Sequence, residues 1–197
     1  MVYNGQEVGE PAVGASGFSG DDARTTIFDY WSLPELARWV NGRRYDGGRL
    51  SAEQRELRGW YGKLLHLGGE PAFARGEFVP LNGMNVENPA FGRLEGEGAS
   101  GHWLYAFLRI DRESGQAFLV VANLHGSETL RGVRVRVSQE ILAGMVRLGS
   151  LISFRDRLAT DWTGDADAEE LGREGLALPG LPPCSALYLE LFSGSHS

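Results

Sequence analysis

Apolar residues recur with a helical period between Leu50 and Phe78. Five of them fall at i, i+3, i+4, i+7 and i+8, so they share one face of a helix and leave charged residues on the other. This apolar stripe consists of Leu57, Trp60, Tyr61, Leu64 and Leu65. Ser51 and Gln54 have the spacing of a capping box, which predicts a helix start near Ser51. Two glycines followed by Pro71 predict its end near Leu67, because proline cannot continue a helix.

After this helix the pattern becomes typical of β-strands. Residues 102–110 and 116–124 are apolar runs separated by the polar residues 111–115, which predicts a hairpin. In residues 130–137 three valines alternate with two arginines, which predicts a strand with one solvent-exposed face. Further short strands are predicted at Glu77–Leu81, Leu151–Leu158, Leu176–Leu178 and Ala186–Phe192. Short strands joined by frequent turns indicate an antiparallel β-sandwich.

Before the helix, turns and loops predominate. Met1–Tyr3 resembles the end of a strand, and Leu33–Val40 has room for two helical turns. The long loop between them is typical of a functional segment. It contains an acidic and aromatic set, namely Asp21, Asp22, Arg24, Asp29, Tyr30 and Trp31. Such side chains suit sugar recognition by hydrogen bonding and ring stacking; the alternative is a solvated loop with anchoring aromatic residues.

Composition excludes several classes of protein. A net charge of −7 with no Lys/Arg cluster argues against a nucleic-acid partner. Cys184 is the single cysteine and the four histidines lack metal-ligand spacing, so we expect no disulfide framework, no metal and no other cofactor. No apolar run has the length of a membrane span, so we expect no membrane partner. The start of the chain lacks the features of a signal peptide, and the compartment stays open.

The order of these pieces resembles a known family. The quoted segments are VYNGQEVGE, LLHLGGEPAFARGEF, YAFLRID, FLVVANLH and LPPCSALYLEL. In this order they resemble the C-terminal end of an α-amylase-family glycoside hydrolase. The resemblance implies an α+β fragment, in which the last βα unit of a (β/α)8 barrel is followed by an antiparallel β-sandwich. Residues 1–74 would be the barrel remnant and residues 75–197 the sandwich.

The resemblance also implies a function and a site. Asn4, Gln6 and Glu7 would follow the eighth barrel strand and face the sugar cleft, or else they hold the loop by hydrogen bonds. Together with Asp22, Arg24, Tyr30 and Trp31 they form the expected substrate-binding set. The substrate would be an α-glucan or oligosaccharide with α-glucosidic bonds. The two catalytic carboxylates of a retaining glycosidase come from earlier strands in the family, so this chain is expected to contain no catalytic residue and to be inactive alone.

Three alternatives remain open. Glu7 and Asp22 form a catalytic pair only if the fold brings them close together, and nothing in the sequence fixes their distance. The chain can instead be a non-catalytic carbohydrate-binding module or a purely structural sandwich. Trp103 and Trp162 are either a sugar-stacking platform or part of the sandwich core.

Overall fold

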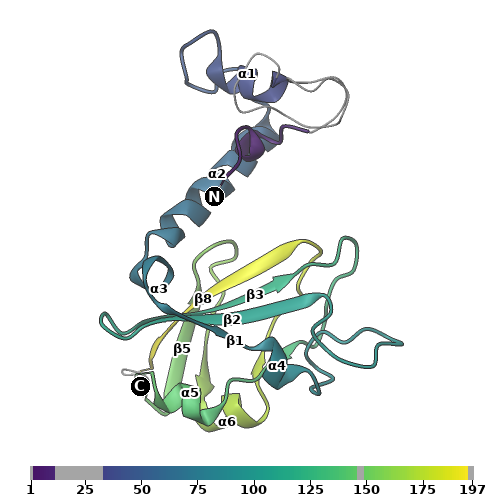
Figure 1. The fold of residues 1–197 in the computed structure, drawn as a ribbon, viewed down its shortest axis with the longest axis vertical. Helices are drawn as coiled ribbons and strands as arrows, with labels where there is room; N and C mark the ends of the chain where they lie inside the picture. Colours follow the sequence, from purple (N-terminus) through teal and green to yellow (C-terminus); the bar gives the residue numbers. More distant parts are fainter. Residues whose placement is uncertain (1, 12–32, 146–148, 195–197) are drawn as a thin grey trace. The chain divides into compact units, whose positions relative to one another are not determined.

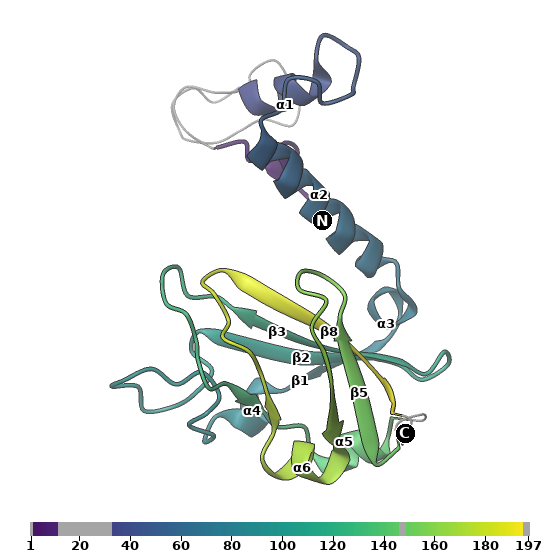
Figure 2. The same ribbon diagram turned by 180° about the vertical axis from the view of Figure 1, so that it is seen from behind.

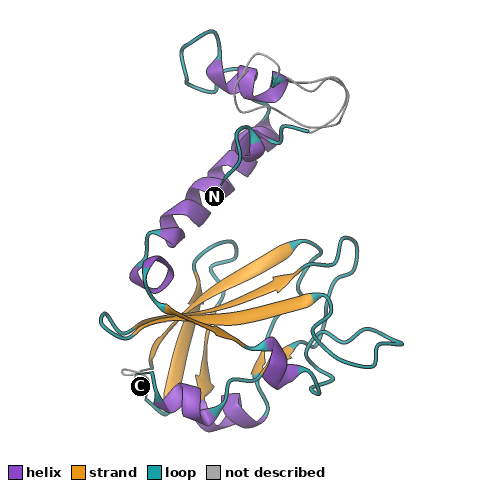
Figure 3. Ribbon diagram, in the orientation of Figure 1, coloured by secondary structure: helices purple, strands orange, loops and turns teal. Residues whose placement is uncertain are grey.

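The computed structural model describes residues 2–11, 33–145 and 149–194 (Figure 1). They form two compact units, Met1–His66 and Leu67–Ser197, and each is described by itself. The first is helical and the second is built on β-sheets (Figure 3). Together the elements make an α+β protein with a six-stranded, mostly antiparallel sheet.

The first unit contains a short 3-10 helix, η1 (Gln6–Val8), and two α-helices, α1 (Pro34–Val40) and α2 (Ala52–Gly68). The predicted capping box of α2 is confirmed. The Ser51 backbone N–H donates to Gln54 Oε1 at 3.0 Å, and the Gln54 N–H donates to Ser51 Oγ at 3.2 Å. The helix therefore begins and ends where the sequence predicted, because the signals that limit it lie within one turn of its ends.

The core of the first unit is small. Within the described residues it consists of Val8, Leu33, Leu36 and Leu50, with Trp39 packed against them. The apolar stripe of α2 takes little part in it, since Trp60 is 38% exposed and Leu65 59%. Packing within this unit therefore leaves much of the stripe uncovered.

The predicted strand at Met1–Tyr3 is wrong for the two of its residues that are described. Val2 and Tyr3 are not in a strand, and the chain turns at once into η1. Gly5 and Gly9 take left-handed conformations, with φ of 86° and 72°, that reverse the backbone there. A strand also needs a neighbour to accept its hydrogen bonds, and no strand lies beside this segment in the described part of the unit.

The second unit is built on an antiparallel sheet with the strand order β1-β2-β3-β8-β5-β6, and a small two-stranded sheet pairs β4 with β7 (Figure 2). The strands are β1 (Glu77–Pro80), β2 (Leu104–Asp111), β3 (Gln116–Asn123), β4 (Arg134–Val135), β5 (Leu151–Asp156), β6 (Thr163–Asp167), β7 (Leu176–Ala177) and β8 (Ser185–Ser193). The short helices are α3 (Pro71–Ala74), α4 (Asn82–Asn85), α5 (Gln139–Ala143) and α6 (Ala168–Arg173). Every strand that the sequence predicted in this region is present, although β4 and β7 are very short.

One face of the large sheet forms the core of the second unit. Leu108, Leu119 and Leu189 stand side by side on neighbouring strands and are at most 1% exposed. The small sheet packs over this face, since Val133 and Val135 belong to the same core cluster and are fully buried. The arrangement is consistent with the predicted sandwich, but the second layer is two short strands and short helices rather than a full sheet.

The β2–β3 hairpin confirms the predicted turn. Asp111 pairs with Gln116 at its end, and the Asp111 carboxylate accepts hydrogen bonds from the Ser114 N–H at 3.1 Å and the Ser114 hydroxyl at 2.5 Å. These bonds, together with a 3.1 Å ion pair to Arg75, lower the pKa of Asp111 to about 2. The turn residues thus fix the register of the two central strands.

Helix α3 belongs with the sheet. The Arg109 guanidinium donates to Ala72 O at 3.0 Å and to Phe73 O at 2.9 Å. The Phe73 ring lies 4.9 Å from Phe118 and 5.7 Å from Tyr188, measured between ring centroids. The two units accordingly divide between His66 and Leu67, ahead of the boundary after residue 74 that the sequence suggested.

Candidate functional site

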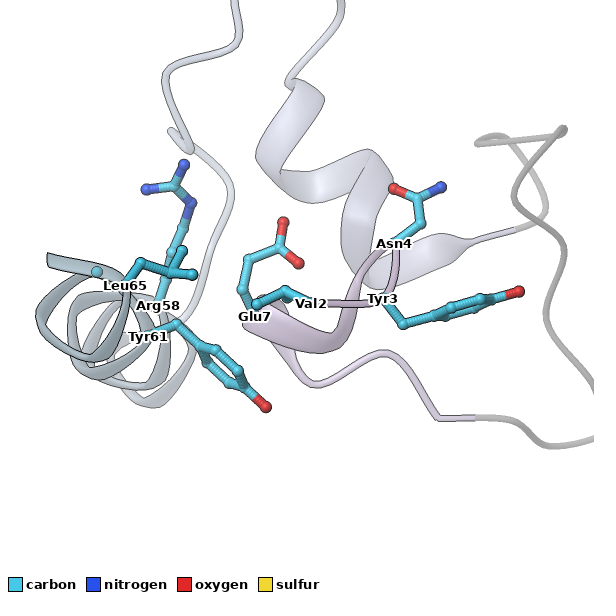
Figure 4. A pocket seen from close by; sticks show the side chains of 8 residues that line it. Val2, Tyr3, Asn4, Glu7, Arg58, Tyr61 and Leu65 are labelled. Carbon is cyan, nitrogen blue, oxygen red and sulfur yellow. The ribbon is translucent and has the colours of Figure 1, made fainter. Parts of the chain in front are cut away.

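The first unit contains a cleft of about 360 Å³ between its N-terminal turn and one face of α2 (Figure 4). The side chains that give this N-terminal cleft its chemistry are Tyr3, Asn4, Glu7, Arg58, Tyr61 and Leu65. Its size is within the range of small-molecule sites, about 300–1,000 Å³. It is the strongest candidate for a binding site in this unit.

Backbone geometry places the two walls. One wall is formed by η1 and the residues before it. The Gln54 side-chain amide on α2 donates a hydrogen bond to Val8 O at 3.0 Å and so holds η1 beside α2. The other wall follows from helical spacing, since positions 58, 61, 62 and 65 fall at i, i+3, i+4 and i+7 on α2. Gly62 adds no side chain at the middle of that wall, and an added Cβ there would meet no atom within 4 Å. The cleft is open as a result.

The lining combines rings with polar groups of both charges. Figure 4 shows the α2 residues on one side, the N-terminal turn on the other, and Glu7 between them. The Arg58 guanidinium also lies over the Trp39 ring, with its Cζ 5.0 Å from the ring centroid. This cation–π contact restrains the guanidinium group. Tyr61 offers a ring for stacking, while Glu7 and Asn4 offer acceptors and a donor for hydroxyl groups.

This chemistry suits binding better than bond cleavage. Retaining glycoside hydrolysis needs two carboxyl groups about 5 Å apart. Among the described residues that line the cleft, Glu7 is the one carboxylate. Asp22, the other member of the pair considered from the sequence, lies outside the described residues. The described part of the cleft therefore offers one acid and no nucleophile opposite it.

The site residues predicted from the sequence differ in where the structure places them. Asn4 and Glu7 are half-buried and line the cleft. Gln6 is not among the lining residues, and its Oε1 accepts a hydrogen bond from the Tyr3 backbone N–H at 3.0 Å; its role in sugar binding remains a prediction. Asp22, Arg24, Tyr30 and Trp31 lie outside the described residues, and their role in binding remains a prediction.

Sequence reasoning missed the α2 side of the cleft. The sequence pattern places Tyr61 and Leu65 in the apolar stripe and gives Arg58 no role. Helical spacing does indicate that these residues share one face of α2, with the guanidinium at position 58, the aromatic ring at 61 and the aliphatic side chain at 65. Recognising it as a binding wall requires knowing that η1 faces it.

No group of three or more metal-ligating His, Cys, Asp or Glu side chains occurs in residues 2–11, 33–145 and 149–194. In the same ranges, none of the helices has the length and apolar character needed to cross a bilayer.

No protein-family model matches the chain, and no curated protein matches it. Three solved structures are similar over most of it. They are the galactosidase domain of an alpha-galactosidase-sucrose kinase (14% identity, 92% of this chain and 22% of that chain, TM-score 0.42); a GH36 alpha-galactosidase from Geobacillus stearothermophilus (11%, 91% and 21%, TM-score 0.43); and an alpha-galactosidase from Lactobacillus brevis (10%, 93% and 23%, TM-score 0.45).

The chain thus spans about a fifth of the length of the structures that it matches. All three are alpha-galactosidases, so the comparisons do not support the α-amylase family in particular. At this degree of similarity, neither the family nor the substrate of this chain follows from them.

Proposed function

We propose that this chain is the C-terminal part of a glycoside hydrolase or transglycosylase that acts on α-glucosidic bonds of glucans or oligosaccharides. The first unit would complete a (β/α)8 barrel, and the N-terminal cleft would form one wall of the sugar site. The second unit would be the accessory domain that follows the barrel. The order of motifs along the sequence motivates this proposal, and α2 is the structural observation that carries it.

Helix α2 has an apolar face that the described residues cover only in part. It is 17 residues long, all of them described, and Leu67 is the one buried residue among them. Trp60 is 38% exposed, so the present packing leaves part of its possible burial unused. An outer barrel helix has such a face, because it packs on the parallel strands inside. This helix therefore fits the eighth helix of a barrel.

The cleft fits sugar chemistry. A pyranose has an apolar ring face and a rim of hydroxyls, which match the Tyr61 ring and the polar groups of Asn4, Glu7 and Arg58. Since the described cleft lacks a carboxylate pair, the nucleophile and the acid would come from barrel strands that precede these residues. Residues 1–197 alone are expected to release no product.

The test compares two proteins, the chain itself and the same chain extended by the coding sequence directly upstream of it. The extended protein is expected to hydrolyse an aryl α-glucoside, and the chain alone to be inactive. Glu7→Gln in the extended protein should lower kcat/KM about tenfold or more, the loss expected for one hydrogen bond to the transition state. The control is Glu56→Gln, an exposed glutamate of α2 outside the cleft, which should leave kcat/KM unchanged.

Two results would refute the proposal, and a third would change its substrate. One is a stop codon immediately upstream, and another is turnover by residues 1–197 that Glu7→Gln abolishes. If the extended protein hydrolyses an aryl α-galactoside and not the α-glucoside, the proposed glycosidase activity is supported and the proposed α-glucosidic substrate is rejected.

The second candidate is a non-catalytic carbohydrate-binding module. One observation favours it: the second unit has a complete core of its own and also contains a pocket with an aromatic wall. In that case sugar binding would be found in the second unit without any barrel upstream.

A further inference from the structure

A pocket of about 290 Å³ opens on the second unit, between β5 and β6 on one side and α6 with the β4–β7 sheet on the other. The residues that give it its chemistry are Arg134, Phe154, Trp162, Gly164 and Glu170. All are described, and none belongs to the N-terminal cleft. We call it the Trp162 pocket.

One wall of the pocket is aromatic. The half-buried Trp162 ring packs on Phe154 with centroids 4.6 Å apart and an angle of 50° between the planes. Gly164 makes this packing possible, because a Cβ there would lie 2.6 Å from Phe154 Cζ. The Trp162 side chain is thus held by the core on one side while part of it borders the pocket. A supported ring of this kind suits stacking on an apolar face of a ligand.

The other walls combine aliphatic residues with charged side chains of both signs. Arg134 is 39% exposed and donates to Gly175 O at 3.2 Å, which fixes its direction. Glu170 supplies an exposed carboxylate. Asp165 borders the pocket through its backbone, because its side chain lies on the opposite face of β5 and β6 from Phe154 and accepts a hydrogen bond from the Ser153 hydroxyl. The pocket therefore presents guanidinium donors and carboxylate acceptors around one aromatic side chain.

This combination selects the charge of a ligand. A phosphate or carboxylate ligand would meet the carboxylate of Glu170, and an ammonium ligand would meet the guanidinium of Arg134. A neutral ligand rich in hydroxyls avoids both conflicts, because each hydroxyl both donates to a carboxylate and accepts from a guanidinium. The volume is at the lower limit of known ligand sites and suits one or two sugar rings.

We propose that the Trp162 pocket is a non-catalytic saccharide-binding site, in which one pyranose ring stacks on Trp162 and its hydroxyls are bound by Arg134 and Glu170. The site does not depend on the chain being part of a glycoside hydrolase. Open pockets with one ring bind weakly, so millimolar affinity is expected.

The test titrates the purified full chain with maltotriose and with raffinose, followed by ligand-observed saturation-transfer NMR. Saturable binding to at least one of them is expected, with an affinity loss of about tenfold in Trp162→Ala, since a stacking contact contributes about 1.4 kcal/mol. Trp103→Ala is the matched control, because Trp103 is also half-buried in this unit but lies outside the pocket, between His102 and His125. It should bind as the unaltered chain does.

Further variants keep the proposal testable if Trp162→Ala fails to fold. Glu170→Ala changes an exposed residue, so the fold should be retained, and a loss of about threefold to tenfold is expected. The proposal is overturned if neither saccharide binds, or if Trp162→Ala and Glu170→Ala both bind normally. Loss of binding in Tyr61→Ala alone would assign the saccharide to the N-terminal cleft instead, and tighter binding of glucosamine or inorganic phosphate would reject a neutral ligand.

Discussion

Replacing Phe73 by alanine tests where the second unit begins. The Phe73 ring contacts Phe118, which is fully buried, and Tyr188. A Phe→Ala change at a fully buried site costs about 3–5 kcal/mol. Because Phe73 is half-buried, we expect Phe73→Ala to lower the free energy of unfolding of the second unit by about 2 kcal/mol.

Phe78→Ala is the matched control. Phe78 is 45% exposed, and its ring contacts Phe107 at 5.1 Å rather than a buried side chain. Its replacement should cost less than about 1 kcal/mol. Both variants would be unfolded in urea and followed by far-ultraviolet circular dichroism, in the whole chain and in residues 67–197, with the slope checked for two-state behaviour.

A second measurement reports on the same contact. Burial raises the pKa of the Tyr188 phenol above its ordinary value. Removing the Phe73 ring should expose Tyr188 further and bring that pKa back toward 10, which absorbance titration of the phenolate detects. If Phe73→Ala costs no more than Phe78→Ala and leaves the phenol unchanged, α3 is not part of the second unit and the boundary after residue 74 stands.

Three further predictions concern a turn, a cap and a glycine. The folded-state pKa of Asp111, about 2, lies below the unfolded value of about 3.9, so its stabilisation is present above pH 4 and is lost as the pH falls toward 2. The melting temperature of Asp111→Asn should therefore change less over that pH range than that of the unaltered chain. Ser51→Ala should destabilise α2 by about 0.5–2 kcal/mol, measured as lost helical circular dichroism in urea; an unchanged midpoint would contradict the capping box. Gly175→Ala should lower the melting temperature clearly more than Gly132→Ala does. Both glycines have positive φ, but only at Gly175 would a Cβ lie 2.8 Å from a backbone atom. Equal losses of melting temperature would contradict this close contact.

The sequence by itself determined the elements whose signals are local. The start of α2 depends on two hydrogen bonds between residues three apart, so Ser51 and Gln54 were enough to place it. The β2–β3 hairpin depends on a short polar turn, and the alternating valines of residues 130–137 revealed which side of β4 is buried.

The sequence did not reveal β6, α5 or α6, which are short and mostly polar at the surface. Strand β6 alternates between exposed and half-buried residues, so its hydrophobic signal is weak, and its strand state depends on pairing with β5. Helix α6 begins where the Asp167 carboxylate accepts from two backbone N–H groups, a local cap that the apolar pattern alone does not reveal. Strand order is likewise not local, since β8 lies between β3 and β5.

Only the tertiary structure decided the candidate sites. Asn4 and Glu7 were expected at a cleft, but the second wall of that cleft is α2. A hydrogen bond between Gln54 and Val8, 46 residues apart, brings α2 beside the N-terminal turn. Gln6, which was expected beside them, is not among the lining residues and accepts a hydrogen bond from the Tyr3 backbone N–H. Trp162 was left open between core and platform, and its ring packs on the core while bordering a pocket. A side chain's neighbours across space depend on how distant segments pack, which local propensity does not encode.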